Sequence, residues 1–154
     1  MIVDVAKLGV GEKEFEGEDP GSILEIGLDA VVRVEGPVRY RLSASLAGRS
    51  LIVSGTVEVD VSIVCVKCAE LFSVTVSDPS FMRVFEVENR TASVDLTPDL
   101  RESIILAFPI NPRCAPGCKG VCPRCGMNLN KVVCRCAPPV VDGRWGVLDL
   151  MNLA

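Results

Sequence analysis

The sequence has no histidine, one tryptophan, one tyrosine and five phenylalanines among its 154 residues. Without histidine, the chain lacks the usual general base for a serine or cysteine nucleophile, so nucleophilic hydrolysis is not expected. It also lacks an imidazole ligand, which catalytic zinc sites commonly use. The few scattered aromatic residues do not supply the stacking surface of an RNA-recognition sheet. We therefore expect a protein that is not an enzyme and has no small-molecule substrate.

Long apolar runs are also absent, although 49% of the residues are hydrophobic and the mean hydropathy is +0.38. The apolar segment 104–110 is interrupted by Pro109 and followed by Pro112, well short of the roughly 18 residues of a membrane span. Residues 1–7 do not show the basic and then apolar pattern of a signal peptide. We therefore expect a protein with a packed core that lies in the cytoplasm and does not bind a membrane.

Eight cysteines are the most informative residues that the chain does contain. Six lie between residues 114 and 136, and a Cys-x2-Cys pair lies upstream. Because a Cys-x2-Cys turn can hold two thiolates on one side of a tetrahedral ion, clustered thiols of this kind favour zinc. The candidate metal ligands are Cys65, Cys68, Cys114, Cys118, Cys122, Cys125, Cys134 and Cys136.

Disulfides and a rubredoxin-like iron site are the alternatives to zinc. Disulfides are less expected, because a chain of this length can bury a core without them and because cytoplasmic thiols usually stay reduced. An iron site uses the same paired turns.

In the Cys122–Cys125 turn, Pro123 stiffens the backbone and Gly126 can adopt a positive φ, so that backbone N–H groups point at the sulfurs. The sequence thus predicts one or two structural zinc ions per chain.

Charge is unevenly distributed along the chain. The net charge is -4, yet residues 113–144 carry six Lys and Arg against Asp142 alone, a local charge of +5. A basic, cysteine-rich tail on an acidic body suggests contact with nucleic acid. The equal alternative is that these cations offset the negative charge of zinc tetrathiolates. The candidate RNA-binding residues are Lys119, Arg124, Lys131, Arg135 and Arg144.

Alternation of apolar and polar residues between positions 22 and 88 predicts a series of antiparallel β-strands. The clearest strand is 57–63, in which four apolar residues alternate with polar ones. Residues 47–50 are expected to form one hairpin turn, and Cys65–Cys68 to lie at the tip of another. Further strands are expected at 31–34, 38–42, 51–53, 71–76 and 81–87. The predicted fold class is mainly β (α+β), with an antiparallel sheet or a partly closed barrel.

One helix is predicted to connect this sheet to the tail. Thr97 suits the N-cap, Pro98 the first helical position and Asp99 the positive end of the helix dipole. Apolar residues then recur at helical spacing until Pro109 ends the helix. The acidic segment 11–22 is expected to be an exposed loop.

The cysteine-rich segment 111–141 has little periodicity, so metal rather than apolar burial is expected to hold it together. Asn128–Asn130 is expected to form a turn around Gly126, with Leu129 plugging the space beside the core. The sequence predicts three divisions. Residues 1–96 are an antiparallel β domain carrying a Cys-x2-Cys turn, and residues 97–110 are a helix and connector. Residues 111–154 are a zinc-binding tail with a short C-terminal helix.

Several separated motifs occur in an order that resembles a known family. They are the strand and Cys-x2-Cys turn at 64–72, the segments 94–96 and 101–110, the cysteine motif at 118–130 and Asp-Gly-Arg-Trp at 142–145. Together they resemble the YceD family, the large-ribosomal-RNA-subunit accumulation proteins of bacteria and plastids, over about residues 60–150. Gly143 stands where the family usually has proline, and Val121 where it usually has leucine.

The resemblance implies a cytoplasmic, non-enzymatic factor that supports accumulation of large-subunit ribosomal RNA. It also implies how the cysteines share metal, because family members without the far-tail cysteines keep metal-competent residues at the positions of Cys114 and Cys118. The implied ligand sets are Cys65, Cys68, Cys114 and Cys118 for one site, and Cys122, Cys125, Cys134 and Cys136, in a zinc-ribbon-like tail, for the other. A single zinc with spare thiols stays open, because Cys134-x-Cys136 makes a cramped chelate.

Three functions are consistent with these observations. The first is a ribosome-assembly or RNA-stability factor whose basic tail contacts ribosomal RNA with salt-sensitive affinity. The second is a zinc module in the same pathway that binds a ribosome-assembly protein and has no RNA affinity. The third is a redox sensor whose thiols release zinc on oxidation.

Overall fold

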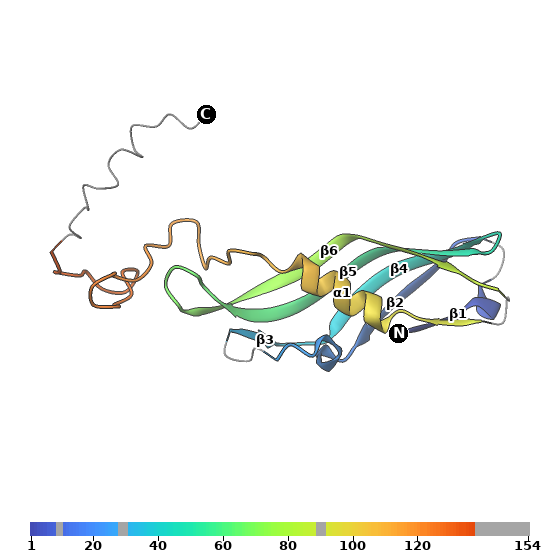
Figure 1. The fold of residues 1–154 in the computed structure, drawn as a ribbon, viewed down its shortest axis with the longest axis horizontal. Helices are drawn as coiled ribbons and strands as arrows, with labels where there is room; N and C mark the ends of the chain where they lie inside the picture. Colours follow the sequence, from blue (N-terminus) through green and yellow to red (C-terminus); the bar gives the residue numbers. More distant parts are fainter. Residues whose placement is uncertain (9–10, 28–30, 89–91, 138–154) are drawn as a thin grey trace, which may run out of the picture.

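The computed structural model describes residues 1–8, 11–27, 31–88 and 92–137 (Figure 1). Its elements are the strands β1 (Ile2–Asp4), β2 (Lys13–Asp19), β3 (Val32–Val34), β4 (Val38–Ala47), β5 (Ser50–Val64), β6 (Leu71–Glu86) and β7 (Ser93–Asp95), the short 3-10 helices η1 (Val5–Lys7) and η2 (Gly21–Leu24), and the helix α1 (Thr97–Ala107). The predicted mainly β class with one connecting α-helix is confirmed within these residues.

Strand β5 is the centre of the larger sheet. Strand β4 pairs antiparallel with its first part and β3 with its last part, while β6 runs antiparallel along its whole length on the other edge. Strand β2 adds to the outer edge of β4, and β1 and β7 form a separate two-stranded sheet. In the described residues β2 does not pair with β6, so the sheet is open rather than a closed barrel.

One face of this sheet forms the core. In β5 the alternate residues Leu51, Val53, Val57, Val59, Val61 and Ile63 are buried, as expected for a strand with one face toward the interior. Helix α1 lies across this face and buries Leu100 and Ile104 against it (Figure 1). Opposite Gly55 (φ +153°), where a Cβ would lie 2.8 Å from Leu42 Cα, β6 carries one extra residue, because Gly55 pairs with Phe81 and Val57 with Asp78. The inward-facing positions of β6 therefore change from even numbers, as in Phe72 and Val76, to odd numbers, as in Phe81 and Phe85.

Three sequence predictions need correction. The acidic segment 11–22 is not an exposed loop, because it contains β2, whose Phe15 faces the core while Glu14 and Glu16 lie on the solvent side. The strands predicted at 71–76 and 81–87 are one continuous strand, β6. Thr97 is not the N-cap, since the cap residue is Leu96 and the Asp95 carboxylate accepts the Thr97 backbone N–H at 2.9 Å.

The segment after α1 extends beyond the tip of the β5–β6 hairpin (Figure 1). Its residues 111–137 contain no helix and no strand, apart from one isolated antiparallel bridge between Val121 and Asn128. The predicted C-terminal helix, with Arg144 and Trp145, lies outside the described residues. Among the described helices, none has the length and apolar character that crossing a membrane requires.

Candidate metal centres

Two Cys-x2-Cys turns of the same backbone design carry four of the eight cysteines. At the tip of the β5–β6 hairpin, Ala69 N–H donates to Cys65 C=O at 2.9 Å, and Ala69 takes a left-handed φ of 58°. In the tail, Gly126 N–H donates to Cys122 C=O at 2.9 Å with φ 72°, the positive φ predicted for that glycine. Both turns thus fold the two cysteine side chains toward one point.

The first cluster, here called the hairpin centre, consists of Cys65 and Cys68 from the hairpin and Cys114 and Cys118 from the tail. The Sγ atoms of Cys65 and Cys118 lie 3.9 Å apart, and those of Cys68 and Cys114 lie 3.7 Å apart. Three of the four cysteines are buried, and Cys114 is exposed. Residues more than forty positions apart therefore meet at one site that joins the hairpin to the tail.

The second cluster, the tail centre, consists of Cys122, Cys125, Cys134 and Cys136. The Sγ atom of Cys134 lies 3.6 Å from that of Cys125 and 3.3 Å from that of Cys122. Cys122 is buried, Cys134 is half-buried, and Cys125 and Cys136 are exposed. This centre is formed entirely by the tail and is more open to solvent than the hairpin centre.

The sulfur–sulfur distances distinguish metal ligands from disulfides. A disulfide bond is about 2.05 Å long, whereas four sulfurs at about 2.3 Å from a tetrahedral ion lie about 3.8 Å from one another. The contacts in both clusters range from 3.3 to 3.9 Å, and all ligand atoms of a cluster lie within 4.8 Å of one another. All eight thiols are free of disulfides. Both donor sets therefore fit a soft, tetrahedral metal ion.

Thiol pKa values within each cluster diverge. Hydrogen bonding from the Cys114 backbone lowers the pKa of Cys65 to about 6, and bonding from the Arg124 backbone lowers the pKa of Cys122 to about 6. The neighbouring sulfur of Cys118 raises the pKa of Cys114 to about 12, and Cys134 raises the pKa of Cys136 to about 12. Within each cluster one thiol ionises readily and another does not, because a thiolate already present disfavours a second negative charge beside it. A bound cation would remove this opposition.

Backbone hydrogen bonds dock the tail against the hairpin beside the first cluster. Val66 N–H donates to Pro112 C=O at 2.9 Å, and Val121 N–H donates to Lys67 C=O at 3.0 Å. The Lys67 ammonium also donates to Cys118 C=O at 3.4 Å. Gly120 (φ +78°) permits this approach, since a Cβ there would lie 3.1 Å from the Lys67 carbonyl oxygen. The hairpin centre is thus supported by hydrogen bonds from both sides of the junction.

Four polar residues surround this junction, and three of them, Asn128, Asn130 and Glu70, are not among the site residues predicted from the sequence. Asn130 Nδ2 donates to Cys118 Sγ at 3.3 Å, while Asn128 Nδ2 and Lys131 Nζ donate to Glu70 Oε1 at 3.2 and 2.7 Å. The Lys131 contact lowers the pKa of Glu70. Sequence analysis treated Asn128–Asn130 as turn chemistry only. No spacing rule connects Glu70 to residues about sixty positions away, so only the fold identifies it.

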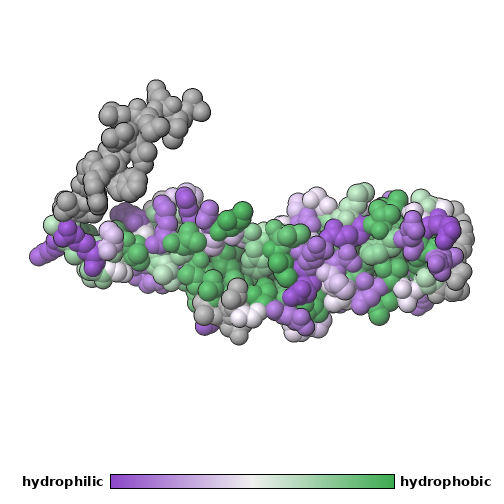
Figure 2. Space-filling view, viewed as in Figure 1, coloured by the Kyte–Doolittle hydropathy of each residue, from purple (hydrophilic) through white to green (hydrophobic). Residues whose placement is uncertain are grey.

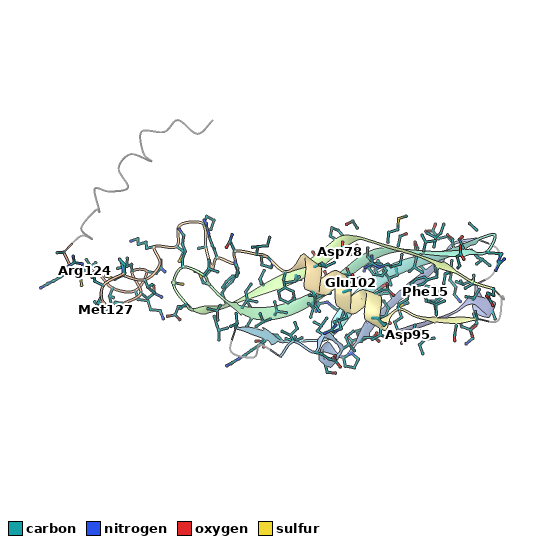
Figure 3. All side chains as sticks on the ribbon, viewed as in Figure 1. Phe15, Asp78, Asp95, Glu102, Arg124 and Met127 are labelled. Carbon is teal, nitrogen blue, oxygen red and sulfur yellow. The ribbon has the colours of Figure 1, made fainter. Side chains whose placement is uncertain are left out.

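The candidate RNA-binding cations lie on the tail surface. Lys119, Arg124, Lys131 and Arg135 are exposed, and Figure 3 shows Arg124 at the end of the described tail farthest from the sheet. Lys131 already forms an ion pair with Glu70 at 2.7 Å. Arg144 lies outside the described residues. Four of the five candidate cations therefore lie exposed on the described part of the tail.

A family model described as large ribosomal RNA subunit accumulation protein YceD matches residues 82–151. This match confirms the resemblance noted in the sequence for the second half of the chain. It begins after the β5–β6 hairpin tip, so the Cys65–Cys68 turn lies outside it.

Curated relatives of two kinds are similar to the chain. Uncharacterized proteins of Mycobacterium bovis and Mycobacterium tuberculosis are 28% identical over 156 residues, covering 84% of this chain and 70% of theirs. The chloroplast protein of Arabidopsis thaliana named large ribosomal RNA subunit accumulation protein YCED homolog 1 is 36% identical over 55 residues, 36% of this chain and 17% of its own length. The Zea mays protein of the same name is 39% identical over 51 residues, 32% of this chain and 17% of its own length. Comparison with solved structures gives no significant match.

Proposed function

We propose, from the resemblance of residues 82–151 to the YceD family, that this protein is a non-enzymatic factor that supports accumulation of large-subunit ribosomal RNA. Its site of action would be the cytoplasm, where such RNA is assembled with protein. Zinc would structure a ribbon-like tail, and that tail would contact RNA. The names of the matched family and of the plant relatives support a role in the accumulation of large-subunit ribosomal RNA. The sulfur–sulfur distances in the two clusters support the binding of zinc.

The observation that carries the metal proposal is the pair of four-sulfur clusters. Zinc accepts four thiolates in a closed tetrahedral site, and such closed sites are structural. No histidine is available to either cluster, because the sequence has none. With all four positions filled by sulfur, neither ion would keep the open position that a catalytic zinc needs. Each ion would instead fix the turns and loops that its cysteines connect.

Metal content by elemental analysis, combined with a count of reactive thiols, tests this proposal. We expect two zinc ions per chain and almost no reactive thiols in protein purified without added metal. The variant Cys65→Ser should bind one zinc, because it removes a ligand from the hairpin centre alone. The matched control is Val66→Ser, which changes an exposed residue of the same turn and should keep both ions. Metal-free protein with disulfides would refute the proposal.

RNA contact by the tail is the second part of the proposal. Electrostatic contacts with phosphates release counterions, so the affinity should fall as salt rises. We expect the double variant Lys119→Ala/Arg135→Ala to bind a large-subunit RNA fragment more weakly, with the salt slope reduced by about one for each phosphate that is no longer neutralised. The control is Arg41→Ala, which removes an exposed cation from the sheet, where it pairs with Glu16 at 2.8 Å. Binding that is insensitive to salt and to the double variant would contradict RNA contact by these residues.

One observation favours the alternative of a protein partner. A groove of about 550 Å³ lies between the end of α1 and the β3–β5 edge, and apolar residues dominate its lining. Figure 2 shows apolar side chains gathered on the middle of this face, and exposed Val66 and Ile110 belong to the groove lining. If the chain binds a ribosome-assembly protein instead of RNA, Ile110→Asp should abolish that binding while the tail double variant leaves it unchanged.

A further inference from the structure

Asn130 connects the two cysteine clusters although it belongs to neither. It lies in the loop between Cys125 and Cys134, whose ends are both ligands of the tail centre. Its side-chain amide nevertheless donates to Cys118 Sγ of the hairpin centre at 3.3 Å. The same amide accepts the Lys119 backbone N–H through Oδ1 at 2.8 Å. One side chain therefore reaches across the junction and contacts both a ligand and the backbone next to that ligand.

The loop holds Asn130 in this position through several further bonds. Asn128 Oδ1 accepts from both the backbone N–H and the Nδ2 of Asn130, each at 2.9 Å. Leu129 N–H donates to Gly120 C=O at 2.8 Å, and Cys122 N–H donates to Met127 C=O at 2.8 Å. The orientation of the Asn130 amide thus depends on a loop whose two ends the tail centre fixes.

A thiolate bound to a metal keeps much of its negative charge, and an N–H donor pointed at the sulfur stabilises it. Partners of this kind, which contact a ligand rather than the metal, typically change metal affinity by about 10- to 100-fold when they are removed. Because the tail centre orders the loop that carries the donor, loading one centre should strengthen the other. By thermodynamic linkage, the strengthening must be the same in both directions.

We infer that Asn130 is a positioning residue that couples metal binding at the two centres, so that the tail centre and the hairpin centre load and unload together. The inference rests on the proposed metal binding at both clusters. It adds that the clusters are not independent, and it identifies the residue through which they communicate.

The test loads the full chain with 113Cd, which gives one resonance for each four-thiolate site, and withdraws the metal with increasing amounts of a chelator. The variant Cys122→Ser/Cys125→Ser identifies the hairpin-centre resonance, because it retains only that centre. In the unaltered chain we expect the two resonances to fade together. In Asn130→Ala both resonances should fade at a chelator activity several-fold lower, and each independently of the other.

Two further variants separate donation to sulfur from simple loop structure. Asn130→Asp keeps the acceptor for the Lys119 N–H but puts a carboxylate beside Cys118 Sγ, so it should weaken the hairpin centre at least as much as Asn130→Ala. If Asn130 acted only through its acceptor bond to the Lys119 N–H, the aspartate variant would stay close to the unaltered chain. Val133→Ala changes an exposed residue of the same loop and should leave both resonances unchanged.

A double-mutant comparison completes the test. Loss of the tail centre through Cys122→Ser/Cys125→Ser should weaken the hairpin centre about tenfold in the unaltered background and should have no further effect in Asn130→Ala. Two resonances that fade independently in the unaltered chain, or an Asn130→Ala affinity within about twofold of it, would overturn the inference. A chain that shows no cadmium resonance would overturn the metal proposal itself.

Discussion

At the scale of single residues, the two Cys-x2-Cys turns differ at one informative position. Each turn places a residue in the left-handed region immediately after its second cysteine. In the tail that residue is Gly126, which adopts φ 72° without steric cost. In the hairpin it is Ala69 at φ 58°, where the Cβ crowds the backbone at a cost of about 1–2 kcal/mol. The same turn is therefore built with strain in one place and without it in the other.

Ala69→Gly should accordingly stabilise the protein. We expect the free energy of unfolding of the metal-loaded protein to rise by about 0.5–1 kcal/mol, because relief of the left-handed strain exceeds the added flexibility of the unfolded chain. Gly126→Ala should lower it by about 1 kcal/mol for the opposite reason. Urea denaturation followed by circular dichroism measures both changes.

A matched control is Gly117→Ala, which alters a glycine next to Cys118 with no positive φ and no atom within 4 Å of the added Cβ. This variant should change stability by less than about 0.5 kcal/mol. A destabilised Ala69→Gly would show that the alanine methyl group contributes packing that outweighs its strain.

At the scale of elements, one buried hydroxyl attaches α1 to the sheet. Ser103 is buried at 4% exposure and donates through Oγ to Asp78 Oδ2 on β6 at 2.7 Å. Asp78 also accepts from the backbone N–H and the hydroxyl of Ser80, each at 2.9 Å. These hydrogen bonds lower the pKa of Asp78 below its ordinary value of 3.8, and the bond from Ser103 has the largest effect. Helix and strand are therefore joined by a charge-assisted hydrogen bond.

Ser103→Ala should lower the free energy of unfolding at pH 7 by about 1–2 kcal/mol, as expected for a hydrogen bond to a charged group. Because the folded pKa of Asp78 is depressed, this stabilisation is fully present above pH 3.8 and is lost as the pH falls through the lower folded value. The difference between the variant and the unaltered protein should therefore shrink below pH 3.8. Urea denaturation at about pH 7 and about pH 3 checks this, with exposed Ser77→Ala as the control on the same strand.

How far the sequence predicts each element depends on what determines that element. Strand β5 was predictable because its valines alternate with polar residues and one face is buried. Strand β2 was missed because its solvent face carries three glutamates, so its composition resembles a loop while only Phe15 provides an apolar signal. The helix start was misplaced by one residue, since Asp95 rather than Thr97 supplies the side-chain acceptor.

In the candidate site, too, the features set by local sequence could be predicted and those set by the fold could not. Cysteine spacing was sufficient to select all eight sulfurs, because a Cys-x2-Cys turn is a local feature of the chain. The contact of Asn130 with Cys118 and that of Glu70 with Lys131 depend on how the tail docks against the hairpin, which no local pattern encodes. Nonlocal polar contacts of this kind became visible only once the fold had been determined.

At the scale of the whole molecule, the chain combines two different sources of stability. Among the residues that the structure describes, the main core is a cluster of nineteen buried hydrophobic residues, all between Val3 and Ile104 and none in the cysteine-rich tail. In the described part of the tail, the buried positions are Cys118, Gly120 and Cys122. Apolar burial can therefore hold the sheet and helix together without metal, whereas residues 111–137 bury too little surface to do so.

Removal of metal with a chelator should separate these two parts. We expect amide hydrogen exchange in β4, β5, β6 and α1 to stay slow, and exchange across 111–137 to become fast, because the turns of that segment would no longer be fixed by bound metal. The N–H groups of Val66 and Val121, which donate to Pro112 and Lys67 across the junction, should report the change.

A comparison with Cys122→Ser/Cys125→Ser at saturating zinc locates the cause. This variant keeps the hairpin centre, so Val66 should stay protected while amides between Cys125 and Cys134 exchange quickly. If the chelator instead exposed the β-strand amides as well, the hairpin centre would be part of the folding core of the sheet and not only an attachment for the tail. The buried apolar face of β5 argues against that outcome, because its packing against α1 involves none of the eight sulfurs.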